Sequence, residues 1–230
     1  MLSAAEQQAL WLSVTVSGTA VLSVLPVAIV IAWLLVRLRF PGRLILDSMV
    51  NLPLVLPPVV IGYLLLLLLG TQGIIGSWLL HTFDIQLIFT WQGAAVSTAV
   101  VAFPLMVRSI RLSLEAIDPN LEIIARTLGA SRLDALCTIT LPLMIPGILS
   151  SVSIGFAAGL GAFGAVITFV SNIPGETRTI PLAIYTALQI PGGEMVAARL
   201  ALLSIGLAIV TLGLSEWLNR VTRQWIGQSC

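Results

Sequence analysis

The stretch LEIIARTLGASRLDALCTITLP, residues 121–142, stands out because it carries four charged side chains within an otherwise apolar chain. Its central glycine, Gly129, separates two short patterns of helical spacing. Neither half is long enough or apolar enough to cross a bilayer, since a spanning helix needs about 20 mostly apolar residues. The stretch therefore predicts a segment that lies outside the membrane, between two spans.

The first half of this stretch predicts an amphipathic helix of about ten residues. Asp118 is suited to cap its N-terminus, Pro119 to occupy its first position, and Gly129 to end it. Four apolar side chains share one face at the spacing i, i+3, i+4, i+7, namely Leu121, Ile124, Ala125 and Leu128. Because Glu122 and Asp134 accompany the arginines of this loop, the helix suits a groove in a partner protein better than an anionic lipid surface.

The second half predicts another short helix, which begins after Ser131 as its cap. This helix should end before Leu141, because the residue that precedes a proline disfavours the helical region. Cys137 lies within it and is interpreted as a small packing residue rather than a nucleophile. A disulfide with Cys230 is not expected, because both cysteines fall in segments assigned below to the cytoplasm.

The composition indicates an integral membrane protein: 58% of the residues are hydrophobic, 9% are charged, and the mean hydropathy is +1.06. All eleven basic residues are arginine, and a P-loop needs a lysine that reaches the phosphates. The chain by itself is therefore not expected to be a P-loop ATPase or a lysine Schiff-base enzyme. One histidine and two cysteines are too few for a metal site built from protein ligands alone, and no cofactor is expected.

Five segments are apolar and long enough to span a bilayer, which predicts an all-α membrane protein with about five transmembrane helices. Prolines within them should introduce kinks. The segment 71–90 is only partly apolar and is interpreted as a loop with an interfacial helix. The five predicted spans are 10–36, 48–70, 91–107, 143–170 and 197–218.

The arginines predict the orientation of the chain, because cytoplasmic loops carry the excess of positive charge. Nine of the eleven lie in 37–43, 108–132 and 220–223, which all fall on one side of the five spans. The N-terminus is therefore expected in the periplasm and the C-terminus in the cytoplasm. The loop 108–142 would then be cytoplasmic and the loops 71–90 and 171–196 periplasmic, within a single domain of residues 1–230.

The predicted spans carry no ionisable residue near their centres, which disfavours a carrier driven by protons or sodium. A stand-alone ion-coupled anion carrier or channel nevertheless remains an alternative, since ion sites can be built from backbone groups. The fourth span carries small residues four apart, Ser151, Gly155 and Gly159. These residues indicate either a face that packs closely against another helix or the lining of a transport pathway.

The spacing of Ala125, Gly129, Ile139, Leu141 and Pro142 resembles the "EAA" loop of inner-membrane permease subunits of ABC importers. The consensus glutamate and first alanine of that loop fall on Ile123 and Ile124, and Glu122 stands one position early.

Three further stretches, 51–66, 103–115 and 167–193, resemble molybdate permeases of this family, and sulfate permeases are looser matches. Those relatives usually carry a glutamate at the position of Ala162.

The resemblance implies a permease subunit in a bacterial inner membrane that forms the pathway of an ATP-driven importer of molybdate or tungstate. The implied partners are two cytoplasmic P-loop ATPase subunits, a periplasmic oxyanion-binding protein, a second permease copy in a homodimer, and the lipid bilayer, without nucleic acid. The chain itself would not be an enzyme.

The resemblance also assigns candidate site residues. Those expected to dock on the ATPase are Leu121, Glu122, Ala125, Arg126 and Gly129. Glu176 and Arg178 are expected to contact the binding protein. A pathway for an oxyanion should offer hydroxyl and amide groups and few fixed charges, because tight binding would slow release. The candidates for this pathway are Ser150, Ser151, Ser153, Thr168, Ser171 and Asn172.

Overall fold

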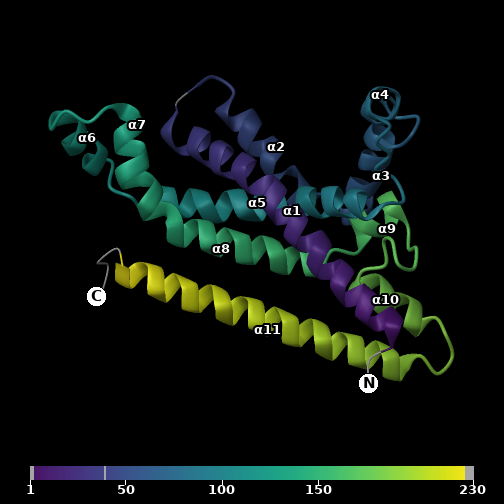
Figure 1. The fold of residues 1–230 in the computed structure, drawn as a ribbon. Helices are drawn as coiled ribbons and strands as arrows, with labels where there is room; N and C mark the ends of the chain where they lie inside the picture. Colours follow the sequence, from purple (N-terminus) through teal and green to yellow (C-terminus); the bar gives the residue numbers. More distant parts are fainter. Residues whose placement is uncertain (1–2, 39, 226–230) are drawn as a thin grey trace.

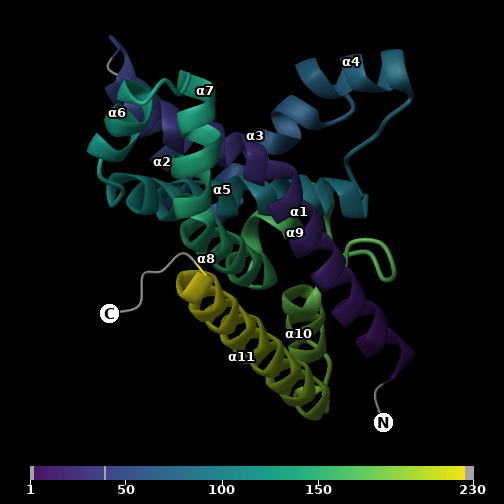
Figure 2. The ribbon, with the colours of Figure 1, turned by 60° about the vertical axis from the view of Figure 1, so that its left-hand side comes forward.

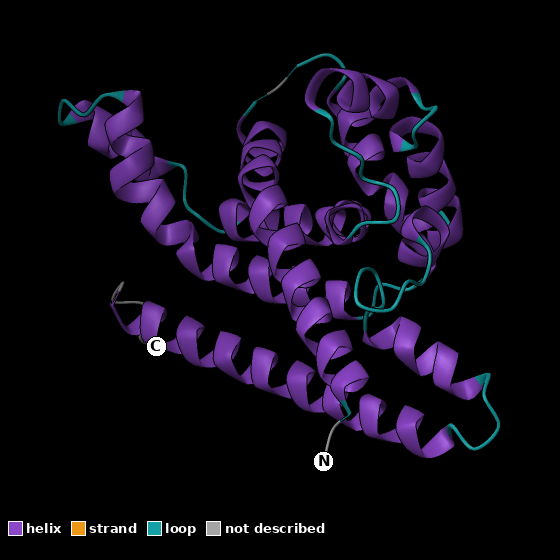
Figure 3. Cartoon of the chain, turned by 45° about the vertical axis from the view of Figure 1, so that its right-hand side comes forward, coloured by secondary structure: helices purple, strands orange, loops and turns teal. Residues whose placement is uncertain are grey.

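A computed structural model describes residues 3–38 and 40–225, and its described elements are helices joined by loops (Figures 1 and 3). The helices are α1 (Ala4–Arg37), α2 (Arg43–Val55), α3 (Pro58–Leu69), α4 (Ile74–Phe83), α5 (Trp91–Glu115), α6 (Asn120–Thr127), α7 (Arg132–Ala135), the π-helical turn η1 (Leu136–Thr140), α8 (Leu141–Leu160), α9 (Gly164–Val170), α10 (Ile180–Leu188) and α11 (Glu194–Trp225).

Four described helices are long and apolar enough to cross a membrane, and the bent pair α2–α3 brings the number to five if it counts as one span. This confirms the predicted all-α membrane fold with about five spans and a short helix between the third and the fourth. The predicted helix within 71–90 is also present, as α4.

Helices α1, α5 and α8 form the centre of the molecule, where α1 crosses the other two (Figure 1). Small residues on α8 permit this close approach. A Cβ atom added to Gly155 would lie 2.6 Å from the Met106 sulfur, and one added to Gly159 would lie 2.9 Å from the Ser17 hydroxyl. The small residues predicted in the fourth span therefore form a packing face. Helix α11 lies beside α8 and α10 (Figure 2) and leaves much apolar surface uncovered.

The second predicted span is broken rather than kinked. Helices α2 and α3 meet at an angle of 115° across Leu56 and Pro57. Leu56 adopts an extended conformation, which the following proline favours, and Pro58 begins the next helix. Two adjacent prolines remove two backbone donors, so the helix ends here instead of bending.

The fourth predicted span, 143–170, is wrong at its C-terminal end. Helix α8 stops at Leu160, the chain turns through 161–163, and α9 follows as a separate helix. Ala162 is buried in this turn against an apolar cluster. The loop 171–196 also contains a helix, α10, that its glycines and prolines did not predict.

Around Pro142 the helix continues where the sequence predicted that it would end. The helix expected to end before Leu141 instead continues from α7 through η1 into α8. The wider turn of a π-helix accommodates the proline ring and its missing donor, which would interrupt a regular α-helix. Helix α7 is therefore continuous with the membrane-spanning helix α8.

Candidate functional site

Helix α6 projects from one end of the helical bundle, and none of its residues is buried (Figures 1 and 2). Pro119 already has helical dihedral angles. Asp118, just before it, acts as the predicted cap, since its carboxylate accepts the backbone N–H of Asn120 at 2.9 Å. Gly129 ends the helix with a φ of 98°, a backbone conformation that residues other than glycine rarely adopt.

Large apolar side chains are exposed on α6 and on Leu128, the residue that caps its C-terminus. Ile123 is 55% exposed, Ile124 is 54% exposed and Leu128 is 84% exposed. We call these three residues the outer face of α6. Leu121 is also exposed, at 40%. A cluster of this kind on a charged helix is typical of a surface that another protein covers.

The opposite side of α6 is tied to two other helices through Glu122. Arg37 Nη2, at the end of α1, donates to Glu122 Oε1 at 2.9 Å. The hydroxyl of Thr140, in η1, donates to the same oxygen. We call this arrangement the Glu122 clamp. The predicted docking residue Glu122 thus faces its own chain.

Removing the charge of Glu122 should loosen α6 without unfolding the bundle. The two side chains of the ion pair are 17% and 27% exposed, so Glu122→Gln should cost about 1 kcal/mol after solvent screening. We expect faster amide exchange across 120–128 in hydrogen–deuterium exchange. Glu176→Gln, at an exposed position in a distant loop, is the control and should leave this exchange unchanged. Equal exchange in both variants would show that the clamp does not hold α6.

The remaining predicted docking residues surround the clamp. Ala125 is half-buried. Arg126 is exposed, and no ion pair is formed by it within the described part of the chain. Arg126 lines a cavity of about 690 Å³ together with Arg37, Glu122 and Thr140.

A capping box follows α6 in the same loop. The Ser131 hydroxyl donates to Asp134 Oδ2 at 2.6 Å, and the backbone N–H of Ser131 donates to the same oxygen at 3.2 Å. The backbone N–H of Asp134 donates back to the Ser131 hydroxyl. These hydrogen bonds, led by the one from the Ser131 side chain, lower the pKa of Asp134. Cys137, one turn further on, is exposed and free, whereas Cys230 lies outside the described residues.

Acidification should therefore fray α7. Because the folded pKa of Asp134 is below its unfolded value, the cap stabilises fully above the unfolded pKa. Its contribution is lost as the pH falls through the folded pKa. We expect amide protection across 132–136, corrected for intrinsic exchange rates, to fall at acid pH in the wild-type chain. Asp134→Asn should lack much of this protection already at neutral pH. Equal protection of the two chains at neutral pH would contradict this role of Asp134.

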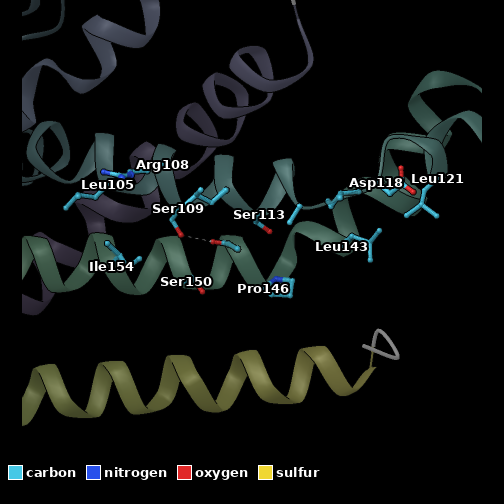
Figure 4. A pocket seen from close by; sticks show the side chains of 14 residues that line it. Leu105, Arg108, Ser109, Ser113, Asp118, Leu121, Leu143, Pro146, Ser150 and Ile154 are labelled. Atoms are coloured by element: carbon cyan, nitrogen blue, oxygen red, sulfur yellow. Dashed lines mark hydrogen bonds between the residues drawn. The ribbon is translucent and has the colours of Figure 1, made fainter. Parts of the chain in front are cut away.

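A second cavity, of about 610 Å³, lies where the final turns of α5 face α8 near the same end of the bundle (Figure 4). Its polar lining comes from Arg108, Ser109, Ser113 and Ser150, with Asp118 at the opposite end from Arg108. The Ser109 hydroxyl points toward α8 and donates to the carbonyl of Gly147 at 3.5 Å. The cavity thus has one arginine and three hydroxyl groups on walls that are otherwise mainly apolar.

The structure disperses the six predicted pathway residues, and Ser150 is the one that lines this cavity. Ser151 and Ser153 are buried and donate to carbonyls of their own helix. Thr168 donates to the carbonyl of Gly164 and packs close to α3. Ser171 is exposed beyond α9, and the amide of Asn172 donates to the Thr186 hydroxyl at 2.8 Å.

The two residues predicted to contact a binding protein lie at the other end of the bundle. Glu176 is exposed in a turn, with Gly175 beside it at a φ of 80°. Arg178 Nε donates to the side-chain oxygen of Asn172 at 2.9 Å, which fixes the arginine against its own loop.

Sequence reasoning missed three groups in these sites. Arg37 was counted only toward orientation, although it closes the Glu122 clamp. Ile123 was treated as a departure from the consensus, although it belongs to the outer face of α6. Arg108 was counted only toward orientation, although it lines the cavity between α5 and α8.

Comparison with known protein families gives a match over most of the chain. The sequence profile described as "Binding-protein-dependent transport system inner membrane component" matches residues 24–224. The chain is 57% identical to the molybdenum transport system permease protein ModB of Escherichia coli K12, over 97% of both chains. It is 53% identical to ModB of Haemophilus influenzae over the same shares. The sulfate transport system permease protein CysT of E. coli is 40% identical over 70% of this chain and 58% of its own length.

Solved structures share the fold at lower sequence identity. A bacterial alginate ABC transporter, in complex with an alginate-bound periplasmic protein, matches with a TM-score of 0.74 and 21% identity, over 96% of this chain and 80% of that one. An amino acid ABC transporter matches with a TM-score of 0.65 and 18% identity, over 94% and 93% of the two chains.

Proposed function

This chain belongs to the family of binding-protein-dependent transport system inner membrane components, and from that premise we propose that it is the permease subunit of an ATP-driven molybdate importer. The relatives of 57% and 53% identity are molybdenum transport permeases, and their similarity extends over nearly the full chain. Tungstate is a tetrahedral dianion like molybdate and would be accepted by the same pathway.

The outer face of α6 carries this proposal on the structural side. A permease of this kind needs an element outside the membrane through which a separate ATPase drives it. Three large apolar side chains on a short helix, held at one end by Gly129, suit a groove in such a partner. Arg126 extends beside them and would pair with an acidic residue of the groove.

The Glu122 clamp and the unbroken helix from α7 to α8 would pass the movement of α6 into the membrane. A displacement of α6 would pull on the end of α1 through Arg37 and on η1 through Thr140. Because η1 continues directly into α8, the motion would reach the small-residue crossing of α1, α5 and α8. The energy would come from ATP bound by the partner.

The complete importer would contain two copies of this chain, two ATPase subunits and one periplasmic binding protein. The chain would act as one domain, with α6 on the cytoplasmic side and α10 on the periplasmic side, in accord with the distribution of arginines. The exposed loop that carries Glu176 and Arg178 would receive the loaded binding protein.

Reconstitution tests this function. The chain, its partner ATPase and its binding protein, all from the same organism, are placed in liposomes and supplied with ATP and radiolabelled molybdate. We expect uptake that requires all three proteins and ATP. Uptake by the chain alone, driven by an ion gradient, would instead identify an ion-coupled carrier.

A further inference from the structure

Arg108 is the residue of the α5–α8 cavity that calls for an explanation. It lies about two turns before the end of α5 and is exposed, and among the residues described here it forms no ion pair. Arg111, one turn further along, is neutralised by Asp47 at 3.2 Å and Glu115 at 2.8 Å. Arg108 directly follows the apolar run 91–107 of the third predicted span and continues the same helix.

The surroundings of Arg108 form an open trough. The residues of α5 that pack into the centre of the molecule, such as Met106 and Ile110, are buried on another side of the helix. Arg108 lines both the α5–α8 cavity and a cavity of about 320 Å³ between α2 and α5. Arg108 is therefore accessible from the space between α2, α5 and α8, and Asp47 and Glu115 also line the cavity on its α2 side.

Two hydroxyl groups accompany the arginine along the cavity wall. Ser109 makes only its long bond to Gly147, and Ser113 has no hydrogen-bond partner within residues 3–38 and 40–225. Both side chains point from α5 toward α8 (Figure 4). Asp118 lies at the far end and holds the backbone N–H of Asn120, so its negative charge would limit how far an anion enters that way.

We propose that this cavity is a transient site for the transported tetrahedral oxyanion, in which Arg108 supplies the charge and the Ser109 and Ser113 hydroxyls donate hydrogen bonds. The inference rests on the proposed function, since it assigns the molybdate dianion to a stage of its passage. One arginine with two neutral donors matches the oxygens of such an ion. A single fixed charge also keeps binding weak enough for release.

The phosphate of an anionic lipid has the same chemistry and could approach from the bilayer. Transported molybdate and a lipid headgroup differ in what controls their occupancy of the cavity. A transported ion follows the molybdate concentration, whereas a lipid headgroup follows the composition of the membrane. The experiment therefore varies the two independently.

Protection of a reporter cysteine tests the site in the full complex. Leu112→Cys places a thiol on the same wall, at a position that is 60% exposed and lines both cavities. Cys230→Ser removes one native thiol, and the exposed Cys137 serves as an internal control. The complex is placed in nanodiscs with or without phosphatidylglycerol and treated with N-ethylmaleimide at constant ionic strength. Leu105→Cys, on the same cavity, is the second reporter if the first fails to assemble.

We expect molybdate to slow modification of the reporter but not of Cys137, in both lipid mixtures. Arg108→Gln should weaken this protection by about tenfold or more in molybdate concentration, as expected for the loss of a charged hydrogen bond. Arg108→Lys should retain part of it. Arg43→Gln removes a positive charge that lines neither cavity and should leave the protection intact.

Absence of protection in a complex that imports molybdate would overturn this site and leave the proposed function standing. Equal protection in Arg108→Gln would also overturn it, as would protection that follows phosphatidylglycerol and not molybdate. A complex that fails to import molybdate at all would contradict the proposed function itself.

Discussion

Ile124→Asp combined with Leu128→Asp is expected to lower ATP-driven molybdate uptake by at least about tenfold. Both side chains belong to the outer face of α6, at 54% and 84% exposure. A carboxylate there would be buried in the groove of the ATPase without a hydrogen-bond or ion-pair partner. This burial costs far more free energy than the loss of the apolar contact. The chain itself should fold normally, because neither residue is covered by its own protein.

Two measurements distinguish lost coupling from lost folding. Co-purification of the ATPase and its stimulation by the loaded binding protein should both fall, whereas thermal unfolding of the isolated permease should be unchanged. Cys137→Asp adds a charge to the same loop at an exposed position outside α6, and it should retain uptake. Normal uptake by the double variant would mean that α6 does not receive the ATPase.

Gly62→Val is expected to prevent stable assembly of the bundle. A Cβ atom at Gly62 would lie 2.6 Å from the carbonyl oxygen of Ala165 and 2.7 Å from the Cβ of Thr168. The obstructing atoms include backbone of α9, which cannot rotate aside as a flexible side chain could. Overpacking of this kind typically costs about 1–3 kcal/mol, and here it would separate α3 from α9.

Gly206→Val is the matched control for this prediction, because nothing lies within 4 Å of a Cβ atom built at that position on α11. The measurement is the thermal unfolding midpoint of the purified chain, with the folded yield from membranes beside it. We expect a marked loss for Gly62→Val and little change for Gly206→Val. Equal midpoints would contradict the close packing of α3 on α9.

The sequence predicted those features that depend on local chemistry and on hydrophobic length. The number of spans follows from runs of apolar residues. The ends of α6 follow from Asp118 and Gly129, whose preferences act within one turn. The break at Pro57 was underestimated because a single proline in a membrane helix usually bends it, whereas here two adjacent prolines end the helix.

The site depended on contacts that no local pattern contains. Glu122 and Arg37 are 85 residues apart in the chain, so the inward direction of Glu122 emerged only when α1 and α6 were placed together. In the same way, Ser151 and Ser153 share the hydroxyl chemistry of Ser150 but face other helices. Helical periodicity cannot tell a pathway face from a packing face when both carry small residues.

Cross-linking from the outer face of α6 tests the central claim most directly. Leu128→Cys, in a chain that also carries Cys137→Ser and Cys230→Ser, is labelled with a photoactivatable reagent in proteoliposomes that contain the complete importer. The proposed function predicts a cross-linked product between this chain and the ATPase subunit, whose yield changes when ATP is added. Cross-links to lipid alone, in an importer that remains active, would contradict it.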